Sequence, residues 1–260
     1  MTLIIGIKCK DGVLMASDGA ATLGSMGIPT ARQPSDKLAI LQDKIIVGVS
    51  GFVGLGQRFT NEIDKLSQDT NFQQKNAIDA MVAISEKLRE HINTEVRAAV
   101  SMMQLIGVQN AQQDALSATL VAIPIQNESE LFQYTQQGSP ERATEELPFV
   151  SIGIGQQLAD PFLGFIRRIF WPNGCPTINE ASFAAYWTLK HSISLSPGGI
   201  ADPLQMTALI KNGDNWVTKE YSPQEINDHE PFVGAAEDSL RRFKENMQSE
   251  ENAEEIPQPS

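Results

Sequence analysis

The sequence predicts an α+β fold with four layers, in which two antiparallel sheets pack face to face between two layers of helices. The expected elements follow the order strands, two helices, strands, two helices and strands along the 260 residues. The chain opens with two hairpins, and hairpins join antiparallel strands, which disfavours a doubly wound parallel sheet. Each pair of helices would cover the outer face of one sheet, because an amphipathic helix buries its apolar side.

The first fifty residues contain four apolar segments rich in β-branched side chains, at residues 3–7, 13–18, 37–41 and 44–49. The first two are joined by Asp11-Gly12, a pair that favours the tight turn of a hairpin. The last two surround Gln42-Asp43 and form a second hairpin. The segment between the hairpins, residues 19–35, is rich in Gly, Pro and Thr and is predicted to be a loop.

Helical periodicity replaces the strand pattern after Gly51. Apolar residues at spacings of three and four predict helices at residues 52–66 and 74–103. Strand patterns return at residues 118–123, 131–134 and 149–153, with a polar link at residues 136–146. A second pair of helices is expected at residues 156–170 and 178–194, followed by closing strands at residues 204–210 and 216–219.

The C-terminal part of the chain differs in charge. Residues 222–260 carry ten acidic and three basic side chains, a net charge of −7 out of −12 for the whole chain. We therefore divide the chain into a domain at residues 1–221 and an acidic extension at residues 222–260. In the extension we expect a short amphipathic helix at residues 233–247 and a disordered tail at residues 248–260, whose deletion leaves assembly intact.

The charge balance and the cysteine content narrow the function classes. The chain has 20 Lys and Arg against 32 Asp and Glu, which disfavours nucleic-acid binding because phosphates need a basic surface. No apolar run reaches the roughly 18–20 residues that span a bilayer, and no secretory signal opens the chain. The two cysteines, Cys9 and Cys175, make no disulfide framework and fit a reducing cytoplasm. The three histidines are widely separated, so neither a metal site nor another cofactor is expected.

One residue at the start of the chain has catalytic chemistry if the residue before it is removed. Loss of Met1, which the small side chain of Thr2 favours, would make Thr2 the N-terminal residue. Its hydroxyl and α-amine would then share one Cα, and an α-amine with a pKa of about 7.7–8.0 can accept the hydroxyl proton. Thr2 is therefore a candidate nucleophile that carries its own base, although many proteins begin with Met-Thr.

Four segments near the start of the chain together resemble one family. They are Thr2-Leu3-Ile4-Ile5-Gly6-Ile7, Asp11 to Asp18, Ser35-Asp36-Lys37-Leu38 and Gly48-Val49-Ser50-Gly51. In this order and at these spacings they resemble the proteasome β-subunit and HslV superfamily of N-terminal-nucleophile hydrolases, and within it they look most like the proteasome homologue of β-proteobacteria. The resemblance implies a threonine endopeptidase without a cofactor. It also implies stacked homo-oligomeric rings that enclose polypeptide substrates, with an ATPase unfoldase as a possible partner.

The resemblance implies roles for six residues. The catalytic group would be Thr2 as the nucleophile, Asp18 and Lys37 as its charged supports, and Gly51 as the backbone oxyanion donor. The substrate-binding residues would be Thr22, whose backbone pairs with an extended substrate, and Val49, which forms the base of a pocket for apolar side chains. Each of three residues also has a purely structural interpretation when taken singly. Asp18 fits a turn that ends a strand, Lys37 fits a solvated strand residue, and Gly51 fits a tight entry into a helix.

Two positions depart from the family pattern. Ile154 stands between two glycines where family members carry a serine that supports the terminal amine. A family aspartate ahead of a Gly-Gly pair has no counterpart, since Ser192, Ser194 or Ser196 falls there. These departures leave two alternatives open. One is a proteasome-like ring that binds polypeptides with little or no catalysis, and the other is an N-terminal-nucleophile amidohydrolase that acts on small molecules.

Overall fold

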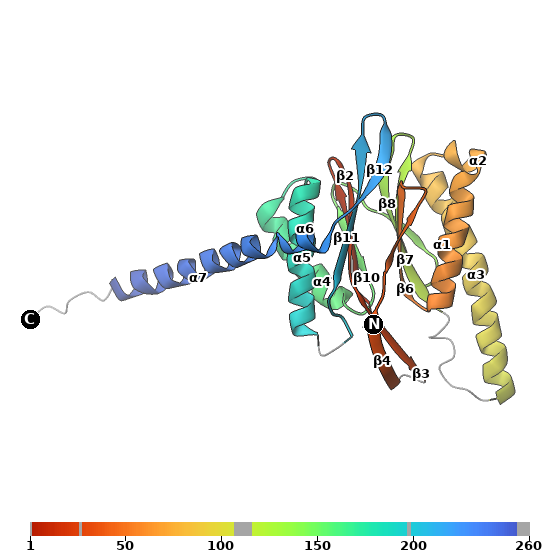
Figure 1. The fold of residues 1–260 in the computed structure, drawn as a ribbon, viewed down its shortest axis with the longest axis horizontal. Coiled ribbons are helices and arrows are strands. Elements are labelled where there is room, and N and C mark those ends of the chain that lie inside the picture. Colours follow the sequence, from red (N-terminus) through yellow and green to blue (C-terminus); the bar gives the residue numbers. More distant parts are fainter. Residues whose placement is uncertain (1, 26–27, 107–115, 197–198, 254–260) are drawn as a thin grey trace, which may run out of the picture.

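A computed structural model describes residues 2–25, 28–106, 116–196 and 199–253, with the side chains of residues 22–32, 106 and 248–253 excepted. Two sheets of five strands each form the centre of the molecule (Figure 1). The first sheet has the order β10 (Phe149–Ile152), β1 (Ile4–Cys9), β2 (Gly12–Asp18), β11 (Leu204–Asn212) and β12 (Asn215–Glu220). The second has the order β5 (Leu38–Leu41), β6 (Ile45–Gly51), β7 (Ser117–Ile125), β8 (Glu128–Tyr134) and β9 (Pro140–Arg142). All neighbouring strands are antiparallel.

Helices cover the outer face of each sheet (Figure 1). The first sheet is covered by α4 (Gln156–Phe170) and α5 (Ile178–Leu195). The second is covered by α1 (Val53–Gln68) and α3 (Ala77–Ile106), which the short α2 (Thr70–Gln73) connects. The predicted four-layer arrangement of two antiparallel sheets between helices is confirmed.

The continuous apolar run of β1 follows from burial on both of its faces. Ile4 faces the second sheet and packs with Met15 and Leu131. Its neighbours Leu3 and Ile5 point to the opposite face and pack against α4 and α5. Because successive side chains of a strand point to opposite faces, a strand between two layers needs apolar residues at consecutive positions. The N-terminal residues are thereby held firmly in the core.

The predicted loop at residues 19–35 is wrong. This segment forms a two-stranded antiparallel ribbon, β3 (Ala20–Ser25) and β4 (Ile28–Pro34), with a register shift between Leu23 and Gly24. A ribbon of two strands consists only of edge strands, which tolerate the prolines that suggested a loop. The polar link at residues 136–146 likewise contains the three residues of β9 at the edge of the second sheet.

The C-terminal segment is more helical than its polarity suggests. It forms α6 (Pro223–Asn227) and α7 (Glu230–Ala253), so the expectation of disorder is wrong for residues 248–253. The sequence there is rich in Glu, Gln and Ala, which favour helix even without apolar residues. Residues 254–260 lie outside the described part. Ile226 of α6 is 3% exposed and packs in the same core cluster as α4 and α5. The division of the chain into a domain and an extension at residue 221 stays a prediction.

Across residues 2–253, in the ranges given above, no helix has the length and apolar character needed to span a bilayer.

Candidate active site

A buried carboxylate organises the region around residue 2. Asp18, the last residue of β2, has no exposed surface. Its Oδ1 accepts hydrogen bonds from the backbone N–H of Leu3 at 2.8 Å and from Nζ of Lys37 at 2.6 Å. Its Oδ2 accepts from the backbone N–H groups of Ala20 at 3.3 Å and Ala201 at 3.4 Å. A buried negative charge is tolerated only when it is paired and hydrogen-bonded, and Asp18 meets both conditions.

Lys37 supplies the positive charge of this site. It lies just before β5, and its side chain is 7% exposed. Burial lowers the pKa of the Lys37 ammonium, while the hydrogen bond to Asp18 acts in the opposite direction. Lys37 Nζ and the backbone N–H of Leu3 bind the same carboxylate oxygen, so the ammonium lies close to the backbone of residue 2.

A glycine loop holds the backbone of Thr2 from the other side. The carbonyl of Thr2 accepts a hydrogen bond from the backbone N–H of Gly155 at 3.3 Å. Gly153 has φ of +98°, and a Cβ there would lie 2.1 Å from the carbonyl oxygen of Thr2 and 3.0 Å from Oγ of Ser50. Only glycine fits this position, because both the backbone angle and the close contact exclude a side chain.

Gly51 ends β6 at the border of an open cleft. Its φ is +130°, and a Cβ would lie 2.4 Å from the carbonyl oxygen of Leu116. The next residue, Phe52, donates its backbone N–H to Oγ of Ser117 at 3.0 Å, which fixes the turn from β6 into α1. Gly51 and Gly153 line the same cleft, whose volume is about 780 Å³. A substrate in this cleft would therefore have Gly51 beside it.

The two residues assigned to substrate binding lie on different elements. Thr22 lies in β3 opposite Arg32, and its side chain is not described. Within the described ranges β3 pairs only with β4, so the other edge of β3 has no neighbouring strand. Val49 lies on β6 and packs against α1, where a Cβ on Gly56 would lie 3.1 Å from a methyl group of Val49. The roles of both residues stay predictions.

Sequence reasoning missed Gln205 on β11. Its Oε1 accepts hydrogen bonds from the backbone N–H of Lys37 at 2.8 Å and from Oγ of Ser17 at 3.2 Å. Its Nε2 donates to the carbonyl of Ser35 at 3.2 Å and to Oδ1 of Asp36 at 2.6 Å. One side-chain amide thus fixes the segment that carries the site lysine. The only signal in the sequence is a polar residue at the start of an apolar strand pattern, which does not identify its partners.

The positions that depart from the family pattern differ in burial. Ile154 is 59% exposed and lines the cleft beside Gly51. Ser192 is buried, and its hydroxyl has no hydrogen-bond partner among the described residues. Ser194 is exposed and donates its hydroxyl to the carbonyl of His191 within α5.

The structure therefore brings Asp18 and Lys37 together beside Thr2 and places Gly51 on the neighbouring cleft. Their catalytic roles stay predictions. Met1 lies outside the described residues, so the removal that would release the Thr2 amine is also a prediction. In the same described ranges, no three His, Cys, Asp or Glu side chains lie together as ligands of a metal ion.

Comparison with known proteins bears on the family and the fold of the chain. A family model described as "Proteasome subunit" matches residues 2–164. No curated protein matches the sequence.

Several solved structures share the fold. An Anbu mutant (Gly-1) from Hyphomicrobium sp. strain MC1 is 18% identical, with a TM-score of 0.67, over 94% of this chain and 97% of that one. Anbu, an ancestral beta-subunit, from Yersinia bercovieri is 17% identical, with a TM-score of 0.62, over 99% of both chains. A helical assembly of the Anbu complex from Pseudomonas aeruginosa is 16% identical, with a TM-score of 0.68, over 99% of this chain and 98% of that one. At these identities the similarity shows the fold alone.

Proposed function

The chain belongs to the proteasome subunit family, and from this premise we propose that it is a threonine peptidase whose nucleophile is the hydroxyl of Thr2. Removal of the preceding residue would leave Thr2 with a free α-amine. The substrates would be polypeptides, whose extended backbone can pair with the unpaired edge of β3 at Thr22. Val49 would contribute to a pocket for apolar side chains of the substrate.

The reaction follows from the groups around Thr2. The α-amine takes the proton of the Thr2 hydroxyl as the oxygen attacks the carbonyl carbon of the substrate peptide bond. The backbone N–H of Gly51 donates to the oxyanion that forms, and the C–N bond then breaks as the leaving amine receives the proton. Water hydrolyses the resulting ester between substrate and Thr2 and restores the hydroxyl.

The observation that carries this proposal is the shared oxygen of Asp18. Because Oδ1 of Asp18 binds both Leu3 N–H and Lys37 Nζ, a positive charge is held against the backbone of residue 2 inside the protein. A nearby ammonium lowers the pKa of the Thr2 α-amine by repulsion and stabilises a developing alkoxide. Asp18 in turn offsets the cost of burying the lysine charge.

The same proposal includes assembly of several copies. The Pseudomonas aeruginosa Anbu structure is a helical assembly, and this chain shares its fold. That similarity supports assembly of several copies of this chain, and the stacked homo-oligomeric rings stay a prediction from the sequence. No feature of the described residues points to an ATPase partner, which stays a prediction from the sequence. The resemblance to the proteasome homologue of β-proteobacteria also stays a prediction.

The experiment that tests the proposed chemistry is an intact-mass measurement. The purified protein is treated with a boronate or β-lactone directed at N-terminal threonine, and hydrolysis of fluorogenic peptides with apolar residues is followed in parallel. We expect the untreated mass to lack Met1, one adduct per chain, and hydrolysis that disappears in Thr2→Ala. Thr94→Ala, on the exposed face of α3, is the control and keeps both the adduct and the activity. A protein with a free Thr2 amine that forms no adduct and hydrolyses no peptide contradicts the proposal.

A second candidate function is a chamber that binds polypeptides without cutting them. The observation in its favour is Ile154, whose hydrocarbon side chain lines the cleft and stands where the family pattern that the sequence resembles has a serine. This function predicts that an unfolded protein binds equally to wild type and Thr2→Ala and is cleaved by neither. A difference in cleavage between the two proteins rules it out.

A further inference from the structure

The cleft beside Thr2 contains a hydroxyl group that takes no part in the chemistry described above. It belongs to Ser50 of β6, the residue before Gly51, whose half-buried side chain lines the cleft. Among the described residues this hydroxyl has no hydrogen-bond partner. Ser50 therefore serves no side-chain bond within the fold, and its hydroxyl is available to a group of the reaction.

Alternation along two strands places Ser50 and Thr2 on faces that look toward each other. On β6, a Cβ on Gly48 would lie 3.0 Å from Cγ2 of Ile4, so this side of β6 faces β1. Ser50 follows Gly48 by two residues and shares its face. The pairing of β1 with β2 extends to Leu3, whose carbonyl accepts a hydrogen bond from the last residue of β2 at 3.2 Å. Thr2 precedes Ile4 by two residues, so its side chain lies on the face toward β6.

The bare backbone of Gly153 brings the two residues to one small gap. The position that a Cβ on Gly153 would take lies 2.1 Å from the carbonyl oxygen of Thr2 and 3.0 Å from Oγ of Ser50. The sum of these two distances is the greatest separation that the two oxygens can have. The Ser50 hydroxyl is therefore within reach of residue 2, either directly or through one water molecule.

The loop on the other side of Thr2 offers no hydroxyl at the position where one is expected. Ile154 stands where the family pattern has a serine, and its hydrocarbon side chain lines the same cleft. Two further hydroxyls of the cleft, those of Thr135 and Ser139, belong to one turn, in which Oγ1 of Thr135 accepts the N–H of Ser139 at 3.2 Å. Ser50 is thus the hydroxyl placed beside Gly153, and it can take the place of the one that residue 154 lacks.

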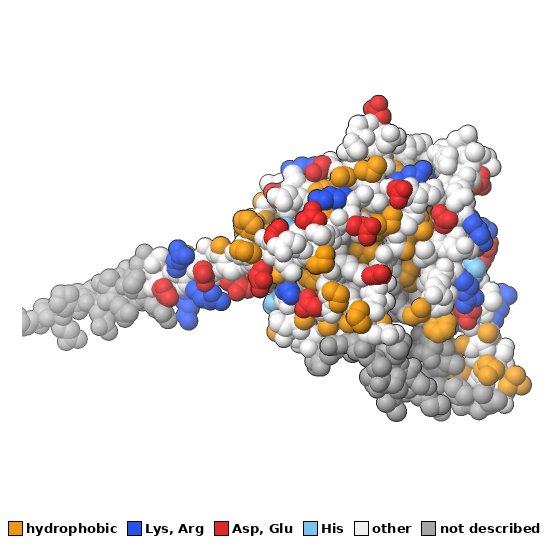
Figure 2. Space-filling view, in the orientation of Figure 1, with side chains coloured by type: hydrophobic (Ala, Val, Ile, Leu, Met, Phe, Trp, Pro, Cys, Tyr) orange, Lys and Arg blue, Asp and Glu red, His pale blue; other side chains and the backbone are white. Residues whose placement is uncertain are grey.

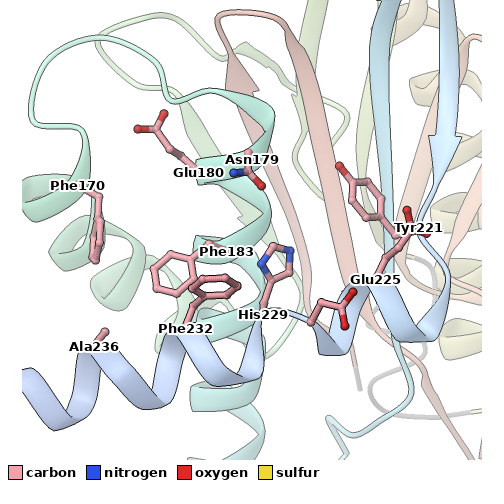
Figure 3. A pocket seen from close by; sticks show the side chains of 10 residues that line it. Phe170, Asn179, Glu180, Phe183, Tyr221, Glu225, His229, Phe232 and Ala236 are labelled. Carbon is pink, nitrogen blue, oxygen red and sulfur yellow. The ribbon is translucent and has the colours of Figure 1, made fainter.

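Another large cavity shares no described lining residue with the cleft. It has a volume of about 590 Å³ and lies where α7 leaves the body, and Figure 2 shows hydrophobic side chains gathered there. Phe170, Phe183 and Phe232 line it (Figure 3). It also includes the first turns of α5, which begins beside Asp11 at the opposite end of β1 from Thr2. The groups that can support Thr2 are therefore those of the cleft.

We propose that Ser50 is a positioning residue whose Oγ accepts a hydrogen bond, directly or through one water molecule, from the α-amine of Thr2. This inference rests on the proposed function, because the amine exists only after Met1 is removed. Ser50 neither gains nor loses a proton in the reaction. With one N–H of the amine held by Ser50, the lone pair is free to point at the Thr2 hydroxyl, whose proton it takes.

The same hydrogen bond affects the pKa of the amine. The charged groups beside residue 2 are Asp18 and Lys37, and the described lining of the cleft contains no ionisable side chain. Asp160 of α4 is bonded to side chains of β10 and of its own helix. The Lys37 ammonium lowers the pKa of the amine by repulsion, and an oxygen that accepts a bond from the protonated amine raises it. Loss of the Ser50 hydroxyl should therefore lower this pKa.

The first test measures the pKa of the Thr2 α-amine and needs no peptidase activity. The full chain is released from a ubiquitin-like fusion so that it begins at Thr2, and acetylation of its α-amine is followed over a range of pH by mass spectrometry of the N-terminal peptide. We expect Ser50→Ala to lower the pKa and Ser50→Thr, which keeps the hydroxyl, to preserve it. Ser101→Ala, the same change at an exposed serine of α3, is the control and preserves it. An equal amine pKa in wild type and Ser50→Ala overturns the proposal, as does an equal fall in Ser50→Ala and Ser50→Thr.

The second test is peptide hydrolysis by the same proteins. Ser50→Ala should lower kcat about tenfold with little change in KM, because the contact orients the base and does not bind substrate. Ser50→Thr should recover most of the lost kcat. A wild-type kcat in Ser50→Ala overturns the positioning role. If none of the proteins hydrolyses peptides while Ser50→Ala still lowers the amine pKa, the proposed peptidase fails and the contact between Ser50 and the amine stands.

Discussion

Replacing Lys37 by methionine isolates the charge pair at the centre of the candidate site. Lys37→Met keeps most of the side-chain volume but removes the ammonium from Oδ1 of Asp18, which has no exposed surface. Breaking a buried ion pair from one side costs about 3–5 kcal/mol. Three backbone N–H groups still donate to the carboxylate, so we expect the lower end, about 3 kcal/mol of unfolding free energy. That loss is a factor of roughly 150 in the folding equilibrium.

Asp18→Asn should cost more, about 4–5 kcal/mol, because the effect has two parts. It removes the negative charge that Lys37 faces, and it turns an amide N–H₂ toward the N–H groups of Ala20 and Ala201, which then lose their acceptor. The double variant removes both charges, so its cost should be lower than the sum of the single costs by about 2 kcal/mol or more.

The assay is urea unfolding followed by tryptophan fluorescence at one protein concentration. The matched control is the exposed pair of Lys190 and Asp202, which lie 3.1 Å apart with side chains 37% and 55% exposed. Lys190→Met should cost about 1 kcal/mol or less, because water screens an exposed ion pair. The account of a coupled buried pair is refuted if Lys37→Met lowers the unfolding free energy by no more than Lys190→Met does. It is also refuted if the double variant loses the full sum of the unfolding free energies lost in Lys37→Met and Asp18→Asn.

Three further predictions concern other parts of the molecule. Gln205→Ala should lower kcat for peptide hydrolysis about tenfold or more, since the amide that fixes the backbone of the site lysine is lost; an unchanged kcat contradicts this positioning role. Gly153→Ala should cost about 2 kcal/mol or more in urea unfolding, because a Cβ would collide with the carbonyl of Thr2. Gly174 also has a positive φ, of +71°, but a Cβ there would have no atom within 4 Å. Gly174→Ala should therefore lower the unfolding free energy by less than Gly153→Ala, and the difference measures the collision apart from the backbone strain. Burial lowers the pKa of His229 below its usual value near 6.5. At pH values between the lowered pKa and 6.5, the unfolded chain therefore binds more protons than the folded chain. The unfolding free energy should therefore fall as the pH drops below about 6.5, and His229→Gln should remove that slope; identical slopes would contradict it.

The layered fold could be predicted from the sequence because its signals are local. The turn at Asp11-Gly12, the apolar strands and the periodicity of the helices are each contained in a short stretch, and they specify which faces are buried. The grouping of Asp18 and Lys37 with residue 2 was also expected, but it came from resemblance to a family and not from a rule of spacing. The ribbon at residues 20–34 was missed because prolines that signal a loop are also compatible with an edge strand.

The tertiary structure decided the features that depend on distant segments. Gln205 reaches Lys37 only because β11 pairs with β2 in a register that sets Gln205 opposite Ser17, and no local pattern specifies that register. The need for glycine at residue 153 arises from the carbonyl of Thr2, which lies 151 residues earlier in the chain. By itself, then, the sequence determined the layers, the strands and helices that build them, and a candidate nucleophile. The contacts that hold Thr2, and the projection of α7 away from the body, were decided by packing between elements far apart in the chain, which short-range patterns do not record.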